Sequence, residues 1–230
     1  SMKAFSILLF FFLFSLELFA QSKLMRMLNP DSVRTRKIFG LPSIYFTPET
    51  NWEFGAAGFS YFKLGKDSIT RPSSVRFSAA YTLNKQVISY LPFQLFMKQN
   101  KYWLFGELAF YRYPYFFRGV GNDYPENTFE RYDAQFPRFR LTALRKLTKD
   151  VYTGPRYWFQ NTDMISVKPG EILDTGRVIG SRGGITSGFG WVINYDSRDK
   201  IFNPSKGLYI QFESLFNSSV LGSDFNYQNY

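Results

Sequence analysis

Apolar and polar residues alternate along most of the chain after residue 40, in short segments separated by turn residues. The clearest segment spans 185–196. Large apolar residues occupy one set of its alternate positions: Ile185, Phe189, Trp191, Ile193 and Tyr195. The other set is small or polar: Thr186, Gly188, Gly190, Asn194 and Asp196. Because successive side chains of a strand point to opposite faces, this pattern predicts a strand with one apolar and one polar face.

The same alternation recurs in 75–84, 138–146 and 208–216. Taken with the turn residues between segments, it predicts an all-β chain of nine antiparallel strands, with a tenth beginning near 224. The predicted strands are 41–47, 52–63, 74–83, 86–97, 101–113, 135–147, 151–161, 185–196 and 207–217. The polar faces carry three arginines that we expect to face the interior of a barrel: Arg76, Arg138 and Arg140.

The lengths of the connections favour a transmembrane barrel over a soluble β-sandwich, which the alternation alone would also fit. Two long connections, 116–134 and 162–184, join an odd strand to the next even one, whereas the even-to-odd links 98–100 and 148–150 are short. Outer-membrane barrels have long external loops and short periplasmic turns. Two other odd-to-even links, 48–51 and 84–85, are also short and weaken this argument.

The N-terminal segment is typical of an export signal. Lys3 precedes an almost unbroken apolar run, 4–16, which is too short for a membrane-spanning helix of about 20 residues. The pattern predicts a signal peptide, 1–20, cleaved after Ala20. Leu18 at the third position before the cleavage site leaves a retained interfacial anchor as the alternative. Residues 21–39 then form a basic periplasmic lead-in, and 40–230 form the barrel domain.

Composition supports a barrel and narrows the chemistry. Aromatic residues make up 20% of the 230 residues, as a lipid-facing barrel surface requires, while a mean hydropathy of -0.23 is too polar for a bundle of membrane helices. The chain has neither Cys nor His, which removes disulfides, Ser-His-Asp catalysis and the commonest metal ligand. We therefore expect no enzyme, no catalytic or metal site and no cofactor.

Two further patterns have competing interpretations. The net charge of +10 and the interleaved basic and aromatic residues at 111–113 and 156–158 would suit a nucleic acid, but a barrel surface with an interfacial aromatic girdle explains them without one. A solvated basic surface with no specific partner is equally compatible with the charge. The Gly-rich run 180–184 has no following helix or Lys-Ser/Thr, so we expect a junction between loop and strand.

A turn motif stands out between the two clearest strands. It consists of Asp196, Arg198, Asp199, Pro204 and Gly207. Asp and Arg at a strand end can form an ion pair across a turn, Pro restricts φ, and Gly permits the chain to reverse before the next strand. On the residues alone, this is a well-formed hairpin connection.

The order Asp-x-Arg-Asp, aromatic, Asn-Pro-x-x-Gly between two strands resembles a motif of the bacterial surface antigen superfamily. These are the barrels of BamA-type and TamA-type outer-membrane assembly factors. Further segments resemble the same family in the same order: 42–56, 113–122, 151–157 and 221–224. The resemblance covers about residues 40–230.

The resemblance implies a barrel of about sixteen strands, of which nine or ten are expected here. Family members usually carry periplasmic POTRA domains, for which this sequence has no room. The family's Arg-Gly-aromatic lumen loop and closing strand would follow residue 230, and Arg118-Gly119-Val120 is not that motif. We therefore expect a short form without POTRA domains that lacks the C-terminal part of its barrel.

The resemblance also implies a function, namely assembly or translocation of outer-membrane proteins at a weak seam whose strand edge templates an incoming strand. The expected seam strand contains Leu41, Ser43, Ile44, Tyr45 and Phe46. The implied partners are outer-membrane lipid, unfolded client proteins and periplasmic accessory proteins, in the outer membrane of a Gram-negative bacterium. Two alternatives remain, which are a passive or structural barrel with an anion-leaning lumen and an outer-membrane enzyme.

Overall fold

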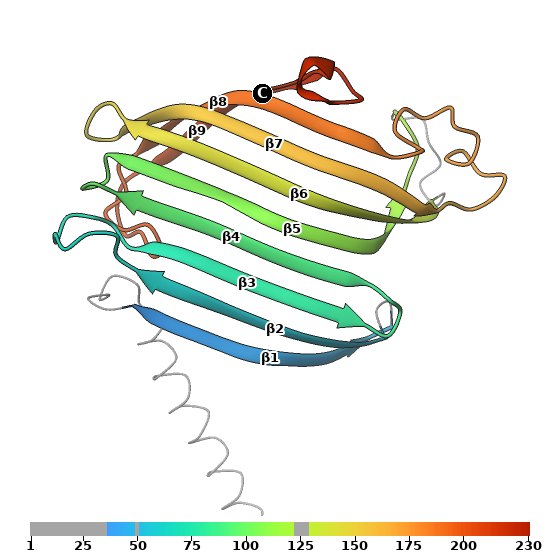
Figure 1. The fold of residues 1–230 in the computed structure, drawn as a ribbon, viewed down its shortest axis with the longest axis horizontal. Helices are drawn as coiled ribbons and strands as arrows, with labels where there is room; N and C mark the ends of the chain where they lie inside the picture. Colours follow the sequence, from blue (N-terminus) through green and yellow to red (C-terminus); the bar gives the residue numbers. More distant parts are fainter. Residues whose placement is uncertain (1–35, 49–50, 122–128) are drawn as a thin grey trace, which may run out of the picture.

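The computed structural model describes residues 36–48, 51–121 and 129–230. Ten antiparallel strands form one sheet in which every strand pairs with its neighbours in the sequence (Figure 1). The strands are β1 (Lys37–Thr47), β2 (Asn51–Phe62), β3 (Ser73–Thr82), β4 (Val87–Met97), β5 (Tyr102–Phe117), β6 (Glu130–Lys146), β7 (Val151–Ser166), β8 (Gly184–Asp196), β9 (Tyr209–Asn217) and β10 (Tyr227–Asn229). A 3-10 helix, η2 (Ser219–Leu221), precedes β10.

The all-β class and the nine expected strands are confirmed, and the tenth is confirmed as a strand of three residues. Several boundaries were wrong. β1 begins at Lys37, so the expected lead-in 21–39 ends three residues too late. β5 and β6 extend further because their outer halves pair with each other up to Phe117 and Glu130. The expected signal peptide, 1–20, lies outside the described residues.

The connections lie at the two opposite ends of the sheet. The end that carries the β2–β3, β4–β5, β6–β7 and β8–β9 connections, on the left in Figure 1, is called the turn end, and the other is called the loop end. At the turn end, the β4–β5 and β6–β7 connections are short, as expected for the links 98–100 and 148–150. Residues 63–72 and 197–208 form longer connections, close to those that the predicted strands left at these places.

The sheet is strongly curved. Rings of Trp103 in β5 and Tyr209 in β9 have centroids 6.5 Å apart, although three strands separate them. In a flat sheet, strands four positions apart would lie about 19 Å from each other. The face that carries these two rings is therefore the concave face, and the sheet curls around it.

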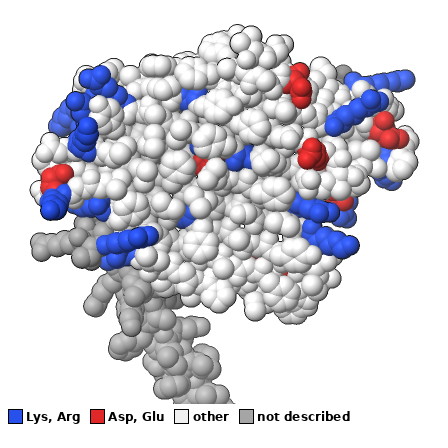
Figure 2. Space-filling view, in the orientation of Figure 1, with Lys and Arg blue, Asp and Glu red and all other residues white. Residues whose placement is uncertain are grey.

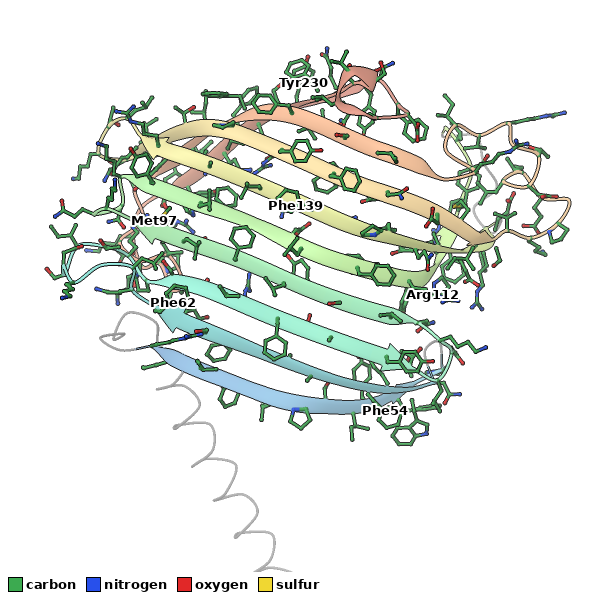
Figure 3. All side chains as sticks on the ribbon, in the orientation of Figure 1. Phe54, Phe62, Met97, Arg112, Phe139 and Tyr230 are labelled. Atoms are coloured by element: carbon green, nitrogen blue, oxygen red, sulfur yellow. The ribbon has the colours of Figure 1, made fainter. Side chains whose placement is uncertain are left out.

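The opposite, convex face is apolar across the sheet, as the alternation predicted. Phe139 lies in its middle, and Phe54, Phe62 and Met97 lie toward its ends (Figure 3). Lys and Arg lie along the left and right margins of this face, whereas its centre is largely uncharged (Figure 2). Its large side chains stay accessible: Phe77, Phe189, Trp191, Ile193, Ile210 and Phe212 are 44%, 48%, 49%, 47%, 54% and 56% exposed.

The main hydrophobic core lies on the concave face near the turn end. Phe96, Trp103, Leu144, Tyr152 and Val192 form a buried cluster drawn from β4 to β8. The rings of Phe96 and Trp103 stack with centroids 5.3 Å apart, and Tyr152 meets Trp103 edge-on at 5.6 Å. Edge-to-face and offset aromatic pairs favour such packing beyond the area they bury.

The sheet is open. β1 pairs with β2 alone and β10 with β9 alone, and β1 does not pair with β10 among the described residues. β1 is anchored along all 11 of its residues, from Lys37 opposite Tyr61 to Thr47 opposite Asn51. β10 pairs through three residues only.

Candidate functional site

A buried carboxylate organises the start of the β8–β9 connection. Asp196 is the last residue of β8, and its side chain is fully buried. Its Oδ1 accepts hydrogen bonds from Nε of Arg198 at 2.8 Å and from the Arg198 backbone N–H at 3.2 Å. Its Oδ2 accepts from Nη2 of Arg198 at 3.2 Å and from Nη1 of Arg71 at 2.9 Å. Two guanidinium groups thus compensate a charge whose burial would otherwise be costly.

Arg71 reaches this carboxylate from the β2–β3 connection, 125 residues earlier in the chain. Its Nη2 also donates to the carbonyl of Arg198 at 3.2 Å. The backbone of Arg71 is fixed by the β4–β5 turn, because its N–H donates to Oδ1 of Asn100 at 2.7 Å. Asn100 in turn donates to the carbonyl of Ile69 at 2.9 Å. We call the contact among Arg71, Asp196 and Arg198 the clasp.

Asp199 shapes the rest of the turn. Its Oδ1 accepts hydrogen bonds from three backbone N–H groups: Lys200 at 2.9 Å, Ser205 at 3.0 Å and Lys206 at 3.2 Å. The N–H groups of Lys206 and Ser205 lower the pKa of the Asp199 carboxyl below its ordinary value of 3.8, because they stabilise the charged form. The charged carboxylate therefore holds the two sides of the turn together.

The turn packs onto the concave face. Ile201 lies against the hydrophobic core, and the ring of Phe202 meets Tyr61 of β2 edge-on at 5.1 Å. Gly207 has a φ of 101°, and a Cβ there would lie 2.3 Å from the carbonyl oxygen of Ser197. Only glycine fits that position without displacing the backbone.

The structure therefore brings together the predicted motif residues and one partner that the sequence did not reveal. Asp196 and Arg198 pair within the turn, and Asp199 and Gly207 determine its shape. Pro204 directly precedes Ser205, whose N–H donates a hydrogen bond to Asp199. The restricted φ of Pro204 limits the path of the chain at this point. Arg71 was missed because nothing local marks a loop arginine whose partner lies so far along the chain.

The predicted interior arginines all belong to the concave face. Arg138 and Arg140 lie beside Glu107 of β5, with Nη2 of Arg140 at 3.1 Å from Oε2 and Nη1 of Arg138 at 3.9 Å from Oε1. Arg76 shares this face because it pairs with Phe59, which lies two residues from the concave Tyr61. The two β6 arginines are thus partly neutralised by one glutamate, which the alternation in the sequence did not predict.

A second ion pair on this face was also missed. The Arg156 side chain is only 5% exposed and forms an ion pair with Glu213 of β9. Its Nε donates to Oγ1 of Thr142 at 2.8 Å. Arg156 occupies the polar set of positions in the predicted strand 151–161, so the same alternation that selected Arg138 and Arg140 could have identified it.

The expected seam residues all lie in the edge strand β1. They are Leu41, Ser43, Ile44, Tyr45 and Phe46, which face Ala57, Gly55, Phe54, Glu53 and Trp52 of β2. Pro42 lies among them and has no N–H to donate to a ladder. The other edge of β1 pairs with no strand in the described part of the chain.

Among the described residues, no group of three or more Asp, Glu, His or Cys side chains is placed to hold a metal ion. No helix of that part of the chain is both long and apolar enough to span a membrane. No protein-family model matches the sequence, and no curated protein sequence is significantly similar to it.

The clasp predicts a large and specific loss of stability in Arg71→Ala. One of two cations would leave the buried Asp196 carboxylate, so we expect a loss of about 2 kcal/mol or more. Urea unfolding in detergent micelles measures it. In an Asp196→Asn background, Arg71→Ala should lower the free energy of unfolding much less. Arg112→Ala, at the margin of the sheet, should lower it by under about 0.5 kcal/mol. Additive effects of Arg71→Ala and Asp196→Asn would contradict the clasp.

Asp199 predicts a pH dependence confined to the turn. Because the pKa of its carboxyl is lower in the folded protein, it stabilises the turn fully above the unfolded value near 3.8. That stabilisation is lost as the pH falls through the lower folded value. The protection of the Ser205 and Lys206 amides, which is their hydrogen exchange rate compared with the unstructured rate at the same pH, should decrease over this range. Asp199→Asn should show the same low protection at every pH, and a wild-type-like acid response in that variant would assign the effect to another group.

Proposed function

We propose that this chain forms the membrane-spanning part of a β-barrel in the outer membrane of a Gram-negative bacterium, and that it helps to assemble or translocate outer-membrane proteins. An incoming strand would be templated by backbone pairing at the exposed edge of β1. The partners would be outer-membrane lipid, unfolded outer-membrane proteins and periplasmic accessory proteins. No cofactor, nucleic acid or catalytic step is part of this proposal.

The apolar convex face carries the membrane part of the proposal. Large apolar side chains cover it from β1 to β9 and remain exposed, while charge gathers at the margins (Figure 2). In water, so large an apolar surface would favour aggregation. In a bilayer it would face hydrocarbon, with the charged margins at the headgroups and the polar concave face toward the interior.

The asymmetry of the two sheet edges supports the templating part. β1 is held in register by β2 along its whole length and presents its other side unpaired in the described part of the chain. A strand that is anchored on one side and open on the other is a ready template for another chain. Pro42 interrupts its row of donors, so an incoming strand would pair most continuously on the Ser43–Phe46 side.

A passive pore is the second candidate, because Arg138, Arg140 and Arg156 line the concave face. Glu107 and Glu213 pair with them, which leaves a smaller excess of positive charge than the sequence alone suggested. The β8–β9 turn also covers the concave face at the turn end, where Ile201 meets the core. Both features reduce the current and the anion preference that such a pore would show.

Phe139→Lys tests the contact with lipid. A charge in the middle of the apolar face should destabilise the inserted protein by about 2–4 kcal/mol if that face meets the bilayer centre. Each variant is folded into lipid vesicles and titrated with urea. The folded fraction is measured by electrophoresis, as the fraction that changes its mobility on heating. Ser78→Lys places the same charge on the concave face and should insert nearly as the wild type does. Equal behaviour of the two variants would refute the proposed membrane face.

Strand templating is tested by disulfide trapping, since the chain has no cysteine of its own. Ser43→Cys places a thiol in β1, and client barrel strands carry single cysteines at successive positions. We expect cross-links at alternate client positions during client folding, because strand side chains repeat every second residue. Ser78→Cys in the interior strand β3 should give none. Equal cross-linking from both positions, or none from Ser43→Cys, would exclude templating at this edge.

A further inference from the structure

A cavity of about 310 Å³ opens on the concave face between β6 and β10. Arg140, Arg156, Trp158, Gln160 and Glu213 contribute to its lining. Its volume falls within the range of small-molecule sites, which are about 300–1,000 Å³. Neither the clasp nor the strand edge uses this cavity.

Two glycines in β8 let neighbouring groups lie close to its backbone beside the cavity. Gly188 and Gly190 lie on the concave face, where Gly190 pairs with Arg156 on one side and Leu215 on the other. A Cβ at Gly190 would lie 2.1 Å from the carbonyl oxygen of Ser214, so no larger residue fits without moving the backbone. Because β8 has no side chain here, the guanidinium of Arg156 extends across it to Glu213 on the next strand.

The guanidinium groups are held in place before any ligand arrives. The Arg138 and Arg140 groups lie 5.1 Å and 5.9 Å from the centroid of the Trp158 ring. Arg156 is fixed by Thr142 and Glu213, and Arg140 by Glu107. Preorganised donors lose little freedom on binding, so more of their interaction energy contributes to affinity.

The cluster keeps an excess positive charge. Arg140 and Arg156 line the cavity, and Arg138 lies beside it. These three arginines share two carboxylates, Glu107 and Glu213, so the difference is three minus two, or one positive charge. The Arg140 side chain is 33% exposed, which leaves part of its planar fork accessible from the cavity. That fork matches the geometry of a carboxylate.

We propose that this cavity binds a small, water-soluble sugar acid. The carboxylate is held by Arg140 and Arg156, and the hydroxyl groups exchange hydrogen bonds with Gln160, Thr186 and Asn229, which also line the cavity. The cavity opens to the concave side and away from the apolar face, so the ligand arrives from the aqueous interior. Binding of this ligand does not require that β1 templates a client strand.

Tryptophan fluorescence of the full chain in detergent micelles tests the site, with glucuronate and glucose as probes at constant ionic strength. Glucuronate should change the Trp158 signal saturably and bind at least about tenfold more tightly than glucose, because a charged hydrogen bond is worth roughly 1.5–3 kcal/mol. Trp158→Phe should remove the signal. Equal affinities for the two sugars, or no saturable binding of glucuronate, would overturn the assignment.

Matched variants separate a specific site from general attraction. Arg140→Gln should weaken glucuronate binding about tenfold. Arg156→Gln is combined with Glu213→Gln, so that the Glu213 carboxylate is not left without its partner. This double variant should weaken glucuronate binding by a similar factor. Arg76→Gln removes one charge from the same face outside this cavity and should leave binding unchanged. An equal loss of glucuronate affinity in Arg76→Gln and Arg140→Gln would show that general surface charge attracts the ligand, and it would refute the site.

The source of the ligand is tested with vesicles that contain an acidic glycolipid bearing glucuronate, without free sugar. We expect no change in the Trp158 signal, since the cavity does not face the apolar surface. A response equal to that of free glucuronate would refute a water-soluble ligand.

Discussion

The buried Asp196 carboxylate is the interaction on which the curvature of the sheet depends. It lies at the end of β8, and its two cations come from the adjoining turn and from the β2–β3 connection. Arg71 thereby joins the β2–β3 connection to β8, which lies five strands beyond β3 in the sheet, and the contact between Tyr61 of β2 and Phe202 links the same regions. A flatter sheet would take Arg71 away and leave this fully buried carboxylate with Arg198 as its one cation. The concave core is enclosed because the turn is held over it.

The two faces of the sheet follow from one alternation but obey different constraints. On the convex face the side chains need only be apolar, and large apolar residues fit there as well as small ones. On the concave face the curvature crowds the side chains, so glycines such as Gly190 alternate with long residues that reach across them. Arg156 pairs with Glu213 over a strand that has no side chain at that point. The charge of Arg156 is therefore neutralised across two strands that are not neighbours, which alternation within a single strand cannot reveal.

This difference explains what the sequence could and could not predict. The strands, and the face to which each side chain points, follow from the local alternation of apolar and polar residues. The side chains of Phe77, Phe139 and Phe189 all lie on the convex face, as the alternation predicted. The boundaries of β5 and β6 were missed because their extension depends on mutual pairing. Arg71 was missed because its role depends on curvature, a property of the whole sheet. The motif residues Asp196, Arg198, Asp199 and Gly207 were found, but the sequence suggested only a hairpin and not a cover over the core. The barrel, its membrane and its clients remain predictions.

The same contacts distribute stability unevenly between the two ends of the ladder. The clasp links the β2–β3 connection to the end of β8, so strands β3 to β8 are enclosed between its two sides. β1 lies outside this group of strands, yet it is paired with β2 along its full length. In contrast, β10 is held by three residue pairs. Movement at the β10 edge therefore breaks few hydrogen bonds and need not disturb the core. The full-length pairing with β2 fixes the register of β1 independently of the β10 edge, as the proposed strand addition requires.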